Sequence, residues 1–108
     1  MAQSPNMLKD GEVSLIVIRA LIRLEGSGTN EQILEQIKLI LSSQQKEQEQ
    51  QIKTQFNRVK NDLKKSGLIK QVKYSKLSLT SNLPNPDEYQ DFSNFKDSFE
   101  EQNKTKIK

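Results

Sequence analysis

Apolar residues recur along three stretches of the chain at the spacing of one face of an α-helix. The first stretch begins after Asp10, the expected N-cap, and ends before Gly26. Its stripe is made of Val13, Ile16, Val17, Ala20, Leu21 and Leu24. The second stretch follows "GSGT", where Thr29 and Gln32 are spaced as a capping box. Its stripe is made of Ile33, Leu34, Ile37, Ile40 and Leu41.

The third helix carries a stripe made of Ile52, Phe56, Val59 and Leu63. It should end at Gly67, because glycine most readily adopts the left-handed conformation of a helix C-cap. The preceding stretch, Ser42 to Gln51, contains no apolar residue and is either a loop or the exposed start of this helix. Glutamine and glutamate propagate helices well, so we expect the helix to begin at about Gln45.

Two short apolar runs follow Gly67 and predict a β-hairpin. The strands are expected at Leu68–Val72 and Leu77–Thr80, with Tyr74 and Ser75 near the turn. Leu77 and Leu79 share parity, so both should face the core.

The first helix also carries a second apolar row, which lies on the side opposite its main stripe and consists of Leu15, Ile18 and Ile22. A helix that is apolar on two faces should be covered on both. The cover comes either from the same chain or from a second copy in a homodimer.

The C-terminal part of the chain, residues 83–108, predicts an amphipathic helix with a basic end. Asn85 is the expected N-cap, Pro86 suits the first helical position, and the acids that follow favour the positive end of the helix dipole. One face of this helix is aromatic and consists of Tyr89, Phe92, Phe95 and Phe99. An exposed aromatic row is unfavourable in water. We therefore expect it to pack on Leu15, Ile18 and Ile22, within one chain or across a dimer interface.

Three helices followed by a hairpin is the order of a winged helix. The predicted fold class is mainly α with a small β-hairpin, a winged helix-turn-helix with an additional C-terminal helix. Residues 1–10 would form an N-terminal arm and residues 11–82 the winged-helix domain. In helix-turn-helix proteins the last helix of the trio enters the major groove. That assigns about residues 50–66 to a recognition helix and residues 68–80 to a wing.

Positive charge is concentrated in these same two elements. Between Ile52 and Lys76 there are eight Lys/Arg and one acid, Asp62, whereas the whole chain has a net charge of only +3. Lysines neutralise phosphates, while Asn and Arg also read base edges. The candidate DNA-binding residues are Lys53, Asn57, Arg58, Lys60, Asn61, Lys64, Lys65, Lys70, Lys73 and Lys76. The alternative is that these lysines only solvate a helix face.

The run "NDLKKSGLIKQV", after a helix–helix unit, resembles the N-terminal winged-helix domain of Mrr-type restriction endonucleases. The resemblance covers roughly residues 13–81 and rests on a Leu-Lys-Lys-small-Gly-Leu-hydrophobic run, here Leu63 to Ile69. It implies a winged-helix fold and DNA binding. Mrr-type enzymes add a nuclease domain with an acidic residue and a Glu-x-Lys pair, and no such set follows Thr80.

The composition of the 108 residues argues against catalysis. The chain has no cysteine and no histidine, which removes thiol nucleophiles, the commonest general base and the commonest metal ligands. No phosphate-binding glycine loop is present. We expect no enzyme activity, no cofactor, no metal site and no small-molecule substrate. The sequence also shows neither a signal peptide nor a membrane span, so a cytoplasmic protein is the simplest interpretation.

The sequence therefore predicts a protein that binds double-stranded DNA, acting as a transcriptional regulator or as the recognition module of a defence system. The alternative is a winged helix used as a protein–protein adaptor. In that case the aromatic C-terminal helix would be its docking or dimerisation element.

Overall fold

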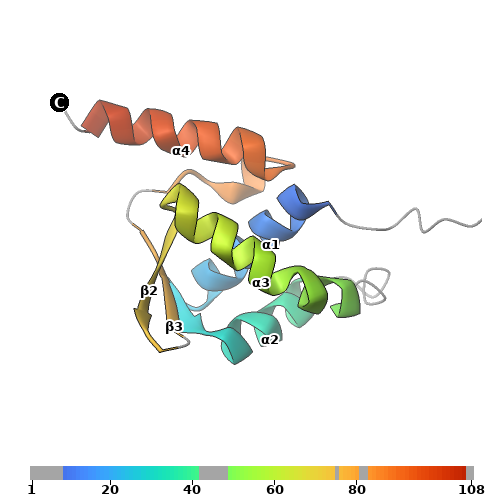
Figure 1. The fold of residues 1–108 in the computed structure, drawn as a ribbon. Helices are drawn as coiled ribbons and strands as arrows, with labels where there is room; N and C mark the ends of the chain where they lie inside the picture. The colour runs from blue at the N-terminus through green and yellow to red at the C-terminus, as the bar shows by residue number, and fades with distance from the viewer. Residues whose placement is uncertain (1–8, 42–48, 75, 81–82, 107–108) are drawn as a thin grey trace, which may run out of the picture.

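The computed structural model of the protein describes residues 9–41, 49–74, 76–80 and 83–106, with side chains up to residue 101 (Figure 1). The expected N-terminal arm and the glutamine-rich stretch at 42–48 lie outside the described residues. The elements in chain order are α1 (Asp10–Arg23), β1 (Ser27–Thr29), α2 (Asn30–Ile40), α3 (Glu49–Ser66), β2 (Ile69–Lys73), β3 (Lys76–Leu79), the 3-10 helix η2 (Pro86–Glu88) and α4 (Phe92–Lys106).

The predicted fold class is confirmed: the described chain is mainly helical, with a β2–β3 hairpin and a C-terminal helix. The hairpin belongs to an antiparallel sheet of three strands in the order β1-β3-β2. We did not predict β1, which pairs through its backbone with β3, Gly28 opposite Leu77. A side chain at Gly28 would force Leu24 to move, because its Cβ would lie 2.6 Å from Cδ1 of Leu24.

Helix α1 begins and ends within a residue or two of its predicted bounds. Its N-cap is Lys9 rather than the expected Asp10, and the Lys9 N–H donates to Oε1 of Glu12 at 3.0 Å. At the other end, Gly26 N–H donates to the Leu21 carbonyl at 2.8 Å. The chain leaves the helix through two residues of positive φ, Glu25 at 64° and Gly26 at 102°.

The predicted signals that begin α2 and end α3 are both confirmed. The Thr29 hydroxyl accepts from Gln32 N–H, while the Gln32 side chain accepts from Thr29 N–H, which completes the capping box. Gly67 has a φ of 86°. The Leu68 N–H donates to the Leu63 carbonyl, and the Gly67 N–H to that of Lys64, both at 3.2 Å. These bonds fix the direction in which the hairpin leaves α3.

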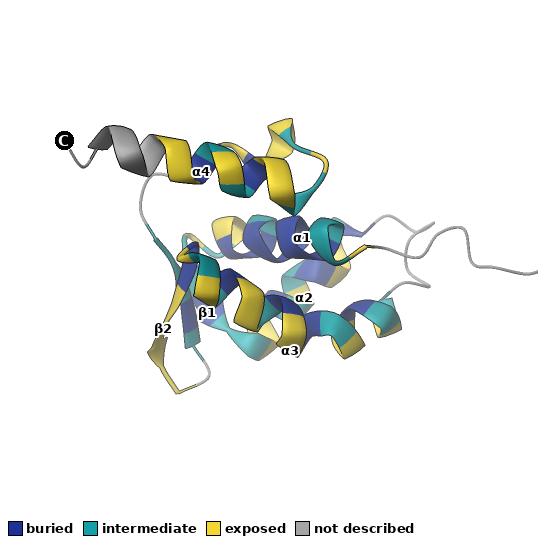
Figure 2. Ribbon diagram, turned by 45° about the horizontal axis from the view of Figure 1, so that its top comes forward, coloured by how far each residue is buried: buried dark blue, intermediate teal, exposed yellow. Residues whose placement is uncertain are grey.

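Helix α1 lies at the centre of the core and packs against α2, α3 and α4 (Figure 2). More than half of its residues are buried, including Leu15 and Ile18 from the second apolar row. Phe95 and Phe99 of α4 belong to the same core cluster, and Phe92 is partly buried against it. The cover for the second row therefore comes from the same chain. Ile22 does not follow the expectation, because 44% of its surface is exposed.

The tail is not the single helix that its N-cap signals predicted. Asn85 does cap a helical turn, since its Oδ1 accepts from Asp87 N–H at 3.1 Å, but that turn is the short η2. A new helix, α4, begins after Asp91, whose Oδ1 accepts from Asn94 N–H at 3.2 Å. The ring of Tyr89, in the connection, lies edge-on to that of Phe95 with centroids 5.7 Å apart.

Arg19 of α1 explains the break in the tail. Its guanidinium donates to the backbone carbonyl of Pro86 at 2.9 Å and to that of Tyr89 at 3.4 Å. It also forms an ion pair with Asp87 at 3.2 Å. Carbonyl groups that would propagate a helix are thus bound to a residue far away in the sequence, and the chain turns before α4 begins.

Candidate nucleic-acid interface

The outward side of α3 has two edges with different surroundings. Ile52, Phe56, Val59 and Leu63 are buried, as the apolar stripe predicted, which fixes the rotation of the helix. Lys53, Lys60 and Lys64 are separated by seven and four residues, so they lie in one row along the first edge. Arg58, Asp62 and Lys65 lie on the opposite edge by the same geometry. Asn57 and Asn61 are exposed between the two edges.

The first edge, which we call the lysine edge, faces α2 and the hairpin. At its C-terminal end the Lys64 ammonium donates to Oε1 of Gln71 on β2 at 3.2 Å. At its N-terminal end Lys53 and Lys38 of α2 both pair with Glu49, at 3.9 and 3.6 Å. The lysine edge is thus joined to the hairpin through Lys64 and Gln71. Figure 1 shows the hairpin leaving the C-terminal end of α3.

The second edge faces α1 and α4. The Arg58 guanidinium pairs with Asp10 at the start of α1, with the nitrogen and oxygen 2.9 Å apart. Asp62 and Lys65 line a small hollow together with Phe92 and Lys96 of α4. Arg58 and Lys65, which the sequence also offered as DNA-binding residues, therefore lie on the edge opposite to the lysine edge.

Two lysines of the lysine edge repel each other at close range. Burial lowers the pKa of Lys60, and the positive charge of Lys64 one turn later lowers it further. The Lys60 ammonium also lies 5.5 Å from the centre of the Phe56 ring, which offers it a weak attraction. An anion bound beside these two ammonium groups would remove the repulsion.

The hairpin holds a second pair of like charges. Lys73 and Lys76 are cross-strand partners next to the turn, after a shift in register between Gln71 and Lys73. Directly opposed like charges destabilise a pair of strands. Lys70 is exposed one position beyond Ile69 on β2. The hairpin thus presents three lysines, Lys70, Lys73 and Lys76, on its two strands.

Two residues of this surface received no role in the sequence analysis. Gln71 joins the hairpin to α3 through Lys64. Tyr74, at the hairpin turn, is 95% exposed, and the neighbouring Val72 is 45% exposed. The exposure of Tyr74 could have been predicted from the sequence, because an aromatic residue in a turn between Lys73 and Lys76 is too far from the core to be buried.

The described residues give this surface positive charge and hydrogen-bond donors. Among them, no group of three or more acidic side chains is placed to hold a metal ion. Within the same part of the chain, no helix is both long and apolar enough to cross a bilayer. What the lysine edge and the hairpin can do is bind an extended anion.

Comparison of the chain with protein families, curated proteins and solved structures finds no match. The resemblance to Mrr-type domains therefore remains an expectation based on the junction around Gly67. The functional argument depends on the geometry of α3 and the hairpin.

Proposed function

We propose that the protein is a winged-helix protein that binds duplex DNA through the lysine edge of α3 and the β2–β3 hairpin. The observation that carries the proposal is the placement of lysines on two adjoining elements. Lys60 and Lys64 lie one turn apart on the lysine edge of α3, and Lys73 and Lys76 are partners across the hairpin. Like charges gathered on one face of a folded protein repel each other, which costs folding free energy. A polyanion that lies along both elements offsets that cost.

The arrangement of the elements supports a duplex rather than an isolated phosphate. The order of helices and hairpin is compatible with a winged helix, in which the third helix enters the major groove while the hairpin follows the backbone. Lys53, Lys60 and Lys64 would contact phosphates along one strand. Asn57 and Asn61, exposed next to them, would be within reach of base edges.

Within this proposal Arg58 and Lys65 have lesser roles. Arg58 is already paired with Asp10, and both residues are on the edge that faces α1 and α4. The sequence-based assignment of Arg58 as a base reader is therefore not part of the proposal. A role as an intracellular regulator or as a recognition module follows from DNA binding and remains part of the same proposal.

The alternative, a protein adaptor that docks through the aromatic tail, receives less support. Phe95 is fully buried and Phe99 is 6% exposed, both within the core of the chain itself. A docking segment would have to leave that core before it could bind a partner.

Neighbouring lysines on opposite edges provide the test. Lys64→Gln and Lys65→Gln make the same chemical change one residue apart on one helix. We expect Lys64→Gln to weaken binding to a fluorescent duplex and to reduce the slope of log affinity against log salt by about 0.9. Lys65→Gln should leave both quantities nearly unchanged.

Gln71→Ala is the structural control, because it removes the hydrogen bond to Lys64 and keeps the charge. It should preserve most of the affinity. Equal losses in Lys64→Gln and Lys65→Gln would mean that the lysine edge is not the binding surface. The absence of any duplex binding at low salt would reject DNA as the partner.

A further inference from the structure

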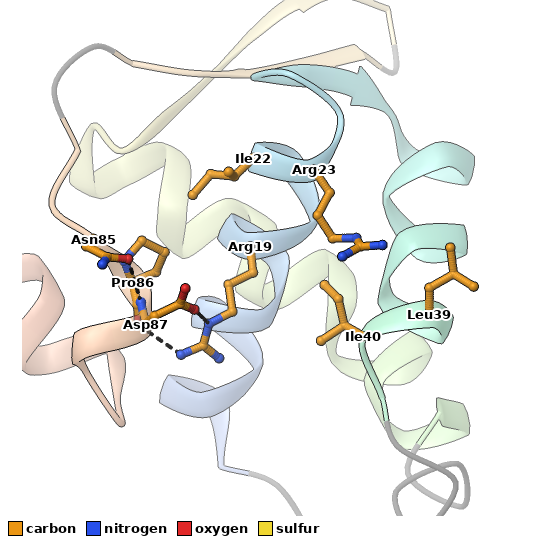
Figure 3. Close-up of a pocket in the computed structure, with 8 residues that line it drawn as sticks. All are labelled: Arg19, Ile22, Arg23, Leu39, Ile40, Asn85, Pro86 and Asp87. Atoms are coloured by element: carbon orange, nitrogen blue, oxygen red, sulfur yellow. Dashed lines mark hydrogen bonds and ion pairs between the residues drawn. The ribbon is translucent and has the colours of Figure 1, made fainter.

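A cavity of about 420 Å³ lies between α1, α2 and the start of η2 (Figure 3). Figure 3 shows it in front of α1, with α3 behind that helix, so it is separate from the lysine edge. Its apolar lining consists of Ile22, Leu39, Ile40 and Pro86. The volume is within the range of about 300–1,000 Å³ that is typical of small-molecule sites.

Two side chains of the lining are unusually exposed for their type. Ile22 of α1 is 44% exposed and Leu39 of α2 is 63% exposed. The two belong to different helices and yet border the same cavity. Apolar side chains placed together in this way gain from a ligand that removes them from water.

The charged lining is unbalanced. It contains two guanidinium groups, from Arg19 and Arg23, and one carboxylate, from Asp87. Arg19 already binds Asp87 and two backbone carbonyls. Arg23 donates instead to a neutral acceptor, Oε1 of Gln36, at 2.8 Å. Within the described part of the chain we find no ion pair for Arg23.

We propose that this cavity binds a small organic carboxylate with an apolar body. The carboxylate would be held by the Arg23 guanidinium, whose planar fork of donors matches the two oxygens. The apolar body would lie on Ile22, Leu39 and Ile40. Arg19 fixes the wall made by Asn85, Pro86 and Asp87 and so shapes the cavity without contributing charge to the ligand.

Recognition of this kind needs both halves of the ligand. If the ligand is apolar and uncharged, Arg23 keeps its hydrogen bond to Gln36 and gains no ionic partner. If the ligand is an anion without an apolar body, Ile22 and Leu39 stay exposed to water. The cavity therefore selects for the combination. The proposal does not depend on DNA binding, since none of the lining residues belongs to α3 or the hairpin.

The test uses the full chain labelled with ¹⁵N and three matched compounds: 2-naphthoate, the neutral 2-naphthamide and the cationic 2-naphthylmethylamine. We expect 2-naphthoate to shift the amide resonances of residues 22, 39 and 40 in a saturable way. The amide should bind at least tenfold more weakly, and the amine should not bind detectably.

Substitutions separate this site from general attraction of anions. Arg23→Gln should weaken naphthoate binding at least tenfold, and Arg23→Lys should recover part of the loss. Arg58→Gln, which removes a guanidinium elsewhere, should have no effect. Equal binding of naphthoate and naphthamide, an unaffected Arg23→Gln variant, or shifts confined to the lysines of α3 would each overturn the proposal.

A second copy of the chain is the competing occupant. Sedimentation velocity across a range of concentrations detects it. If the chain forms dimers that Arg23→Gln and Leu39→Asp both abolish, the cavity is an interface between copies and the carboxylate proposal fails. A chain that remains monomeric and binds naphthoate through Arg23 supports it.

Discussion

The guanidinium of Arg58, in the middle of α3, donates a hydrogen bond to the carboxylate of Asp10 in the first turn of α1, with the nitrogen and oxygen 2.9 Å apart. The same carboxylate oxygen accepts from the side-chain amide of Gln55. Two residues on successive turns of α3 thus hold the start of α1. The hydrogen bond from Arg58 holds the pKa of Asp10 below its ordinary value, and Asp10 in turn raises the pKa of Arg58.

This pair predicts a small loss of stability in acid. The pKa of Asp10 is lower in the folded chain than in the unfolded chain, where it is about 3.9. The stability that the ionised Asp10 adds to the folded chain is therefore present above that pH and is lost as the pH falls through the folded-state pKa. Asp10→Asn should lower the urea midpoint slightly at pH 7 and make no difference near pH 2. Asp97→Asn, on the exposed side of α4, is the control and should change neither midpoint.

The charge of Lys60 is expected to lower the stability of the fold while it strengthens duplex binding. Its pKa is lowered in the folded chain, so its positive charge costs stability at neutral pH, and stability returns as the pH rises through the folded-state pKa. Lys60→Met keeps an unbranched stem over Phe56 and removes the charge. We expect a higher melting temperature together with weaker duplex binding. A lower melting temperature would show that the contact with the Phe56 ring outweighs the cost of the charge.

Gly67 separates α3 from the hairpin through its backbone conformation alone. A Cβ atom at this position would meet no atom within 4 Å, but the φ of 86° is strained for any residue that has one. Gly67→Val should therefore lower the free energy of unfolding by about 1–2 kcal/mol. Gly67→Asn should be milder, since asparagine tolerates positive φ. Equal stability of the valine variant would contradict the left-handed conformation.

Phe95 is the residue through which α4 completes the core. It is fully buried, and Tyr89 lies edge-on to its ring. Phe95→Ala should cost about 3–5 kcal/mol, a large share of the stability of a domain of this size. Phe92→Ala, at a partly buried position, should cost less. Chemical denaturation measures both. A chain cut after residue 82 that melts as the full chain does would contradict the structural role of α4.

The features that could be predicted from the sequence are those set by nearby residues. The apolar stripes of α1, α2 and α3, the capping box of Thr29 and the stop at Gly67 all depend on residues a few positions apart. The strand β1 could not be predicted, because its three residues have no apolar pattern and it exists through its pairing with β3. The break before α4 could not be predicted either, since it depends on Arg19, far away in the chain.

The candidate site also has some features that could be predicted from the sequence and others that could not. Its charge was evident from the residue types, and the helical period alone separates Lys64 from Lys65. The period does not say which neighbour each edge faces. The elements that each edge faces were identified from the contacts of Lys64 with Gln71 and of Arg58 with Asp10, which join different parts of the chain.

The central position of α1 affects how the protein is made. Ribosomes synthesise a chain from its N-terminus, so Leu15 and Ile18 are produced long before Phe95, which belongs to the same core cluster. Until α4 emerges, one apolar face of α1 has no cover from its own chain. We therefore expect the nascent chain to expose this apolar face during that interval, and its core to close only after α4 has been synthesised.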